Sequence, residues 1–160
     1  MNFVPHCWHW FLSSHQISNT NQETEDTINE FLNMFDYSMY IGALNGIHIS
    51  VKSPLELETD HYNYKKFYSV IMLAVVNCDL EFTYINFGAS GQCNDGSVYT
   101  RSNLSKVLQH SIYEDYYMMI NCIKIQSHLI VDSAFVLDRT LMKPFPERPD
   151  MPQYNTIFNY

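Results

Sequence analysis

The sequence predicts an α/β fold in which a mixed sheet is flanked by helices. Three strand-like segments follow one another along the chain, at 47–52, 67–76 and 81–87. A segment with helical spacing then runs from about 95 to 110, and a short apolar strand follows at 126–131. Strands that both precede and follow a helix favour a sheet covered by helices over an all-β or all-α domain.

The composition supports one folded domain. The chain has 160 residues, of which 46% are hydrophobic and 15% aromatic. This is enough apolar surface to build a core, and it excludes a disordered chain. The 12 tyrosines and 10 phenylalanines fit a sheet-rich fold, because aromatic side chains are enriched in strands.

The charge disfavours DNA binding by this chain alone. The net charge is −8 and the pI is about 5.2, and an acidic domain repels phosphate backbones. A catalytic core can still be acidic where metal ions or attached basic segments supply positive charge.

The four cysteines, at positions 7, 78, 93 and 122, contain no C-x-x-C pair. We therefore expect reduced thiols rather than a disulfide or zinc framework. His6, Cys7 and His9 lie close together, but no second pair of ligands accompanies them, which favours a frayed terminus over a metal site.

No stretch of the sequence reaches the ~18 apolar residues of a membrane span. The opening residues 1–5 lack the basic start and the long apolar core of a signal peptide. We expect a nuclear or cytoplasmic protein with no membrane contact.

The sequence divides into a flexible N-terminal segment, 1–22, and a domain at 23–160. The tract at 13–22 is rich in Ser, Asn, Gln and Thr, which is typical of a linker. An amphipathic helix follows, because its apolar residues have the i, i+3, i+4, i+7 spacing of one helical face. These residues are Ile28, Phe31, Leu32 and Phe35.

The remaining elements follow from local patterns. The segment at 67–76 is almost continuously apolar, and we expect it to be a buried strand paired with 81–87 in a hairpin. The segment at 111–126 has no clear period and is expected to be an irregular insert or a surface helix. The tail at 143–152 contains four prolines, which excludes a helix there.

Short motifs occur in a fixed order along the chain. They are Ile41-Gly-Ala-Leu-Asn-Gly-Ile-His-Ile49, Tyr62-Asn-Tyr-Lys-Lys-Phe-Tyr-Ser69, Phe82-Thr-Tyr-Ile-Asn-Phe-Gly88, Gly91 to Tyr99, Val131-Asp-Ser-Ala-Phe135 and Leu141-Met-Lys-Pro-Phe-Pro146. In this order they resemble the segments of PIF/Harbinger transposases and the nucleases derived from them, over residues 24–160. The resemblance implies a ribonuclease-H-like sheet that carries a DDE endonuclease site.

The resemblance also implies a ligand set. In the family, acids on the first strand, the helix start, a later strand and a last helix hold divalent ions, Mg²⁺ or Mn²⁺, for phosphodiester hydrolysis. The first three map onto Asn45, Asp95 and Asp132. The family pattern continues beyond an Asn-Tyr pair like Asn159-Tyr160, so we expect the C-terminal catalytic helix and its glutamate to be missing from this partial domain.

The residue at position 45 decides whether we expect nuclease activity. Its amide oxygen is neutral and cannot bridge two cations as a carboxylate does. We therefore expect an inactive nuclease, with weak binding of one divalent ion by Asp95 and Asp132. The resemblance implies DNA and a Myb-like DNA-binding protein as partners. A non-catalytic protein-interaction module and a truncated gene product remain alternatives.

Each candidate residue also has a purely structural interpretation. Asp95 could only cap its helix, Asp132 could only end a strand in a turn, and Asn45-Gly46 is a common turn pair. His48 is more often a strand residue that makes a hydrogen bond than a catalyst. For the exposed charges the alternatives are phosphate contacts, substitute ligands or plain solvation; these residues are Lys52, Lys65, Lys66, Glu114 and Asp115.

Overall fold

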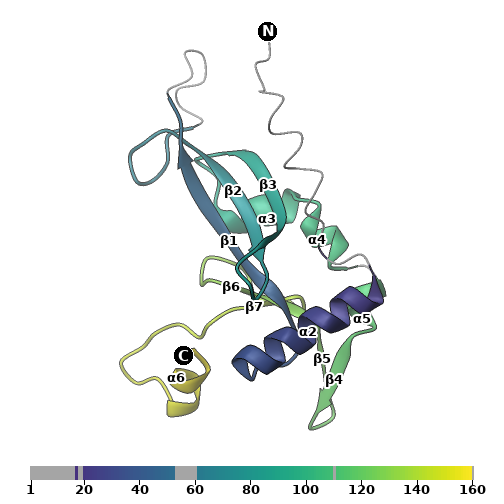
Figure 1. The fold of residues 1–160 in the computed structure, drawn as a ribbon. Coiled ribbons are helices and arrows are strands. Elements are labelled where there is room, and N and C mark those ends of the chain that lie inside the picture. The colour runs from purple at the N-terminus through teal and green to yellow at the C-terminus, as the bar shows by residue number, and fades with distance from the viewer. Residues whose placement is uncertain (1–16, 18–19, 53–60, 110, 160) are drawn as a thin grey trace.

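The computed structural model describes residues 17, 20–52, 61–109 and 111–159 (Figure 1). Helix α2 (Asn21–Phe35) opens this part of the chain. Thr20 caps it, because its side chain accepts a hydrogen bond from the Glu23 backbone N–H at 3.3 Å. It ends at Asp36, which takes the left-handed conformation. The helix thus begins before residue 23, where the domain was expected to start.

The five-stranded sheet has the order β3-β2-β1-β6-β7. Its strands are β1 (Tyr40–Ser50), β2 (Ser69–Val76), β3 (Phe82–Ser90), β6 (His128–Val131) and β7 (Leu141–Met142). Strand β2 runs antiparallel to β1 and β3, whereas β6 runs parallel to β1 and β7 parallel to β6. The predicted hairpin of the second and third strands is confirmed, and the mixed sheet is consistent with a ribonuclease-H-like fold.

Two short helices, α3 (Asp95–Arg101) and α4 (Leu104–Val107), pack on one face of the sheet (Figure 1). One helix was expected from 95 to 110, but Ser102 interrupts it in an extended conformation. The buried Ser102 hydroxyl donates to the Tyr99 carbonyl at 2.7 Å and accepts from the Leu104 N–H at 3.2 Å. These local hydrogen bonds compete with the helical ones and divide the segment.

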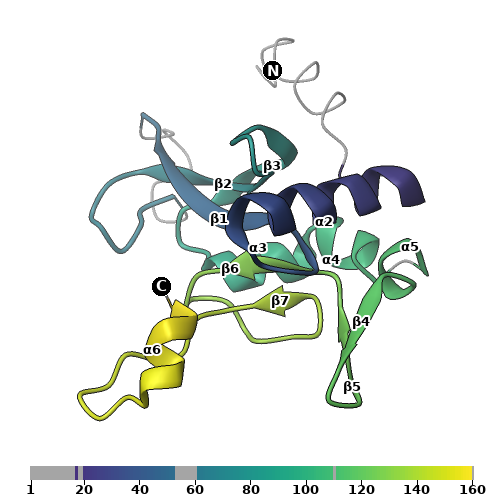
Figure 2. The same cartoon turned by 60° about the horizontal axis from the view of Figure 1, so that its bottom comes forward.

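The segment at 111–126 differs from the expectation of an irregular insert or surface helix. A single helical turn, α5 (Ser111–Glu114), precedes a two-stranded hairpin of β4 (Tyr117–Ile120) and β5 (Ile123–Gln126). Asn121 and Cys122 both have positive φ, 50° and 66°, as a two-residue hairpin turn requires. The hairpin projects away from the sheet (Figures 1 and 2).

The C-terminal tail leads to a short helix, α6 (Gln153–Asn159), which the sequence patterns did not predict. The segment at 143–152 contains no helix, as expected from its prolines. The Asn159 side chain accepts from the Phe145 N–H at 2.8 Å and donates to its carbonyl at 2.9 Å. None of the α6 residues is buried, and the helix lies at the end of a long loop (Figure 2).

The main core fills the space between the sheet and helices α3 and α4. Ile71, Leu73 and Val75 of β2 are fully buried there. Met72, between Ile71 and Leu73, and Val76, after Val75, point to the other face and are only half-buried. Ile17 is also part of this core, at 7% exposure, so the polar tract expected as a linker includes a packed side chain. Residues 1–16, with the His6, Cys7 and His9 cluster, lie outside the described residues.

Candidate functional site

Two of the mapped residues follow paired positions on two adjacent parallel strands. Leu44 of β1 is paired with Val131 of β6. Asn45 and Asp132 come directly after these two residues in the chain. The parallel pairing therefore brings the first and third positions of the expected ligand set to neighbouring places in the sheet.

Asn45 and Gly46 do not form a turn, which corrects the structural alternative for this pair. Both lie in the middle of β1, where they are paired with Ala74 and Leu73 of β2. The Asn45 amide oxygen accepts a hydrogen bond from the Gly46 N–H at 2.8 Å, and the side chain is exposed. A glycine within a strand often marks a close approach by another group, and here that group is a carboxylate.

The carboxylate of Asp95 occupies the place where a side chain at Gly46 would lie. Burial raises the pKa of this carboxyl above its ordinary value, and the negative charge of nearby Asp132 raises it further. The charges of His48 and Lys65 act in the opposite direction. Asp95 is thus a half-buried acid with a second acid in its electrostatic range, as at many functional sites.

Asp95 is not the cap of its helix, so the capping alternative is wrong. The cap is Asn94, whose side chain accepts a hydrogen bond from the Ser97 N–H at 2.8 Å. Asp95 is the first residue of α3, where the helix dipole favours an acid. Its carboxylate is directed toward β1 rather than used for the helix end.

Asp132 lies in a tight turn after β6. Its Oδ1 accepts a hydrogen bond from the Ala134 N–H at 2.8 Å, and the side chain is exposed. The Ala134 carbonyl lies 3.7 Å from the position that a Cβ on Gly96 would take. The turn after β6 and the first turn of α3 are therefore neighbours, which explains the interaction between the two acids.

His48 makes the hydrogen bond expected of a strand residue. Its Nδ1 lies 3.0 Å from the Ser69 hydroxyl, which also accepts a hydrogen bond from the Asn63 side chain at 2.8 Å. His48 is two residues beyond Gly46, so it projects from the same face of β1 toward Asp95. This three-residue network was not predicted, since its members are far apart in sequence.

The other charged candidates do not complete the site. Lys52 and Lys66 are exposed. The charge of Lys65 lowers the pKa of the Asp95 carboxyl. Glu114 and Asp115 lie beside the projecting hairpin, and Tyr116 next to them donates a hydrogen bond to the Asn21 carbonyl at 2.7 Å. Glu114 and Asp115 thus lie near the start of α2 and do not act as substitute ligands near Asp95.

The acidic side chains of the site suit one divalent ion better than two. In the described part of the chain, no group of three or more His, Cys, Asp and Glu side chains could hold a metal ion. Proteins commonly bind one Mg²⁺ through one or two carboxylates, and the ion keeps several of its waters. Two ions need bridging carboxylates, and Asn45 does not supply one. The residues present therefore fit one ion and do not fit a pair.

Comparison with known proteins identifies the family. The family model of the DDE superfamily endonucleases matches residues 44–160. This range is most of the chain and includes all three mapped positions. The chain belongs to this family. DDE superfamily endonucleases generally use divalent metals.

Two curated relatives have the same name, "Putative nuclease HARBI1", one from Homo sapiens and one from Rattus norvegicus. Each is 28% identical to this DDE-family chain over 130 residues, which are 79% of this chain and 34% of the relative. The chain thus spans about a third of the length of these relatives. No solved structure matches it significantly.

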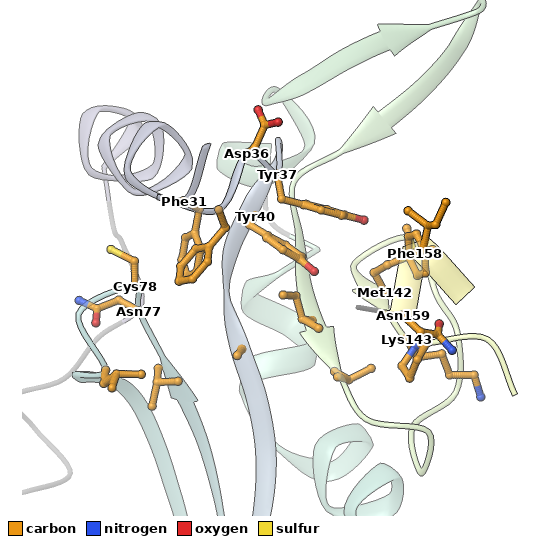
Figure 3. A pocket seen from close by; sticks show the side chains of 18 residues that line it. Phe31, Asp36, Tyr37, Tyr40, Asn77, Cys78, Met142, Lys143, Phe158 and Asn159 are labelled. Carbon is orange, nitrogen blue, oxygen red and sulfur yellow. The ribbon is translucent and has the colours of Figure 1, made fainter. Parts of the chain in front are cut away.

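A separate apolar groove of about 890 Å³ lies on the other face of the sheet. Figure 3 shows Phe31 and Cys78 on one side of it, Met142 and Phe158 on the other, and Tyr40 between them. None of the three mapped residues lines it. The groove is a feature distinct from the acidic site.

No helix of the described residues is long and apolar enough to cross a membrane. Cys78, Cys93 and Cys122 are free thiols.

Proposed function

We propose that this chain is a nuclease-derived domain of the Harbinger type that does not hydrolyse DNA as it stands. It keeps a weak site for one divalent ion, Mg²⁺ or Mn²⁺, between Asp95 and Asp132. The observation that carries the proposal is the pairing of these two acids beside a first-strand position occupied by Asn45.

The chemistry of hydrolysis supports inactivity. Two-metal cleavage of a phosphodiester places ions about 3.5–4 Å apart, where they stabilise the attacking and the leaving oxygens. A bound ion would supply Lewis acidity at the phosphate. The carboxylates must offset up to four positive charges, and an amide at the first position removes one negative charge from that set. Asp95 and Asp132 can position one ion, but the charge of a second stays uncompensated.

Ion binding is the first test. Asp95 lies close to a second acid, so a divalent cation that neutralises both should stabilise the fold. We expect the melting temperature to rise with Mn²⁺ in the wild type and to stay constant in Asp132→Ala. Asp150→Asn, which removes an exposed charge from the tail, is the matched control and should respond like the wild type. A wild type without any response contradicts the ion site.

Cleavage of supercoiled DNA is the second test. The wild type should produce no nicked or linear product with Mg²⁺ or with Mn²⁺. Metal-dependent cleavage that disappears in Asp132→Ala would overturn the proposed inactivity, because it would place hydrolysis at this site. Cleavage that persists in Asp132→Ala does not depend on Asp132 and therefore does not come from this site.

The partners and the cellular location rest on the sequence. DNA as a ligand, a Myb-like DNA-binding partner and a nuclear or cytoplasmic location follow from the resemblance and from the sequence patterns. They stay predictions for this chain, and a pull-down from nuclear extract with the immobilised chain can test the protein partner.

A non-catalytic protein-interaction module is the second candidate function. The apolar groove favours it, because large exposed apolar surfaces commonly mark interaction sites. Leu80 is 81% exposed at the edge of this groove. A partner that binds there should be lost in Leu80→Glu and kept in Val136→Glu, a change at an equally exposed residue that does not line the groove. Recovery of no specific partner counts against this function.

A further inference from the structure

The loop between Tyr62 and Phe67 is held in one conformation by a buried asparagine. Asn63 is only 3% exposed. Its Oδ1 accepts hydrogen bonds from the Lys65 N–H at 2.9 Å and the Phe67 N–H at 3.2 Å. Its backbone N–H donates to the Phe67 carbonyl at 3.0 Å. The loop is therefore an organised element rather than a loose connection.

This arrangement presents two side chains to solvent at the tip of the loop. Tyr64 is 78% exposed, so most of its ring is open to solvent. The Lys65 ammonium lies 5.5 Å from the centre of the Tyr64 ring. Lys66 has a positive φ of 67°, which completes the tight turn. An exposed ring and an adjacent cation are the two groups that single-stranded nucleic acid binds.

The loop tip lies beside the acidic site. The Tyr64 ring is in edge contact with the His48 ring, with centroids 5.7 Å apart. His48 is fixed by the Ser69 hydroxyl, itself held by Asn63, and it shares a face of β1 with Gly46. Gly46 in turn lies against the Asp95 carboxylate. These contacts and the shared face of β1 place the exposed loop tip near Asp95, on whose carboxyl the charges of His48 and Lys65 act.

We propose that Tyr64 and Lys65, supported by His48, form a contact site for single-stranded DNA beside the acidic site. Lys65 binds a backbone phosphate, and Tyr64 stacks on an unpaired base. The inference rests on the proposed function, because DNA is the ligand expected of a nuclease-derived domain. The positive charge of this site also offsets the repulsion that the two acids exert on a phosphate.

The projecting hairpin provides an internal comparison. Lys124 lies 4.1 Å from the centre of the Tyr117 ring, and Tyr117 is 49% exposed. This second lysine and tyrosine pair has the same side-chain chemistry, but it lies on β4 and β5, away from His48 and the acids. Its variants therefore match those of the loop in charge and size without touching the proposed site.

The test measures DNA binding by fluorescence anisotropy at low salt with Mg²⁺. The probes are a labelled single strand of about 12 nucleotides, within the usual site size, and the blunt duplex of the same sequence. Tyr64→Ala should weaken single-strand binding about fivefold or more and leave duplex binding unchanged, because only an unpaired base can stack on the ring. Lys65→Ala should weaken both, and it should reduce the slope of log K against log salt by about 0.7 for the single strand.

Tyr117→Ala and Lys124→Ala are the controls and should bind within about twofold of the wild type. The proposal is overturned if the wild type binds no DNA at low salt, if the loop variants bind like the wild type, or if the hairpin variants lose as much. The Mn²⁺-dependent melting of the wild type reports on Asp95 and Asp132 alone. Failure of the ion site and failure of the DNA contact are therefore separate results.

Discussion

The backbone of Gly46 lies directly against the carboxylate of Asp95. A Cβ at position 46 would overlap all three atoms of that carboxylate. The glycine thus allows an acid at the start of α3 to reach β1, next to Asn45. The close approach connects the fold to the candidate site, because a larger residue in β1 would displace one of its two acids.

Gly46→Ala should destabilise the protein by about 1–3 kcal/mol, the usual cost of overpacking. It should also abolish the Mn²⁺-dependent rise in melting temperature, because the Asp95 carboxylate must move. The matched change is Gly96→Ala in α3, where an added Cβ meets its nearest atoms at 3.6 and 3.7 Å. That variant should be neutral or gain up to about 1 kcal/mol from helix propensity. Equal losses in the two variants would contradict the prediction.

Asp95→Asn should alter the pH dependence of stability. Burial and the charge of Asp132 raise the pKa of the Asp95 carboxyl in the folded state. The folded protein therefore holds this proton more tightly than the unfolded chain, and stability falls as pH rises through the ordinary carboxyl pKa toward the raised value. The variant lacks this loss. Without metal, the melting temperature of the variant should rise relative to that of the wild type between acid and neutral pH.

The stability gain in Asp95→Asn should stay below about 1 kcal/mol at neutral pH, because solvent screens a half-buried group. Asp150→Asn removes the same charge from an exposed position in the tail and should follow the wild-type pH curve. A difference between wild type and Asp95→Asn that is constant with pH would show that the carboxyl titrates alike in both states.

Asn63→Ala should destabilise the loop that carries Tyr64. The substitution leaves the N–H groups of Lys65 and Phe67 without their acceptor, at a cost of about 2–3 kcal/mol. Asn94→Ala removes only one hydrogen bond, the cap of α3, and should cost about 1 kcal/mol. Urea unfolding measures both. A smaller loss in Asn63→Ala than in Asn94→Ala would show that the loop is not held by this side chain.

Asn45→Asp should bind Mn²⁺ about tenfold more tightly than the wild type, a gain of roughly 1.4 kcal/mol, because it returns a carboxylate beside Asp132. It should still not cleave supercoiled DNA, because three carboxylates do not offset the four positive charges of two divalent ions. Asn103→Asp adds the same charge at an exposed position before α4 and should leave Mn²⁺ affinity unchanged. Calorimetry measures binding. Cleavage by Asn45→Asp alone would show that three acids suffice.

Several elements were predicted from local patterns because their residues are close in sequence. The apolar run of β2 and the return at β3 predicted their hairpin, and the prolines of the tail correctly excluded a helix at 143–152. The β4–β5 hairpin was missed because its tyrosines and methionines have no clear alternation. The break between α3 and α4 was missed as well, since it depends on hydrogen bonds of one buried side chain, Ser102.

The sequence by itself determined the fold class, the family and the side chains at the three mapped positions, including the neutral Asn45. Only the tertiary structure decided which of these side chains meet. The parallel pairing of β1 with β6 brings Asn45 beside Asp132, and the open space at Gly46 admits Asp95. The burial of Asp95 and the charge of Asp132 both raise the pKa of the Asp95 carboxyl. Such effects depend on packing between segments that are distant in the chain, and local sequence patterns do not show this packing.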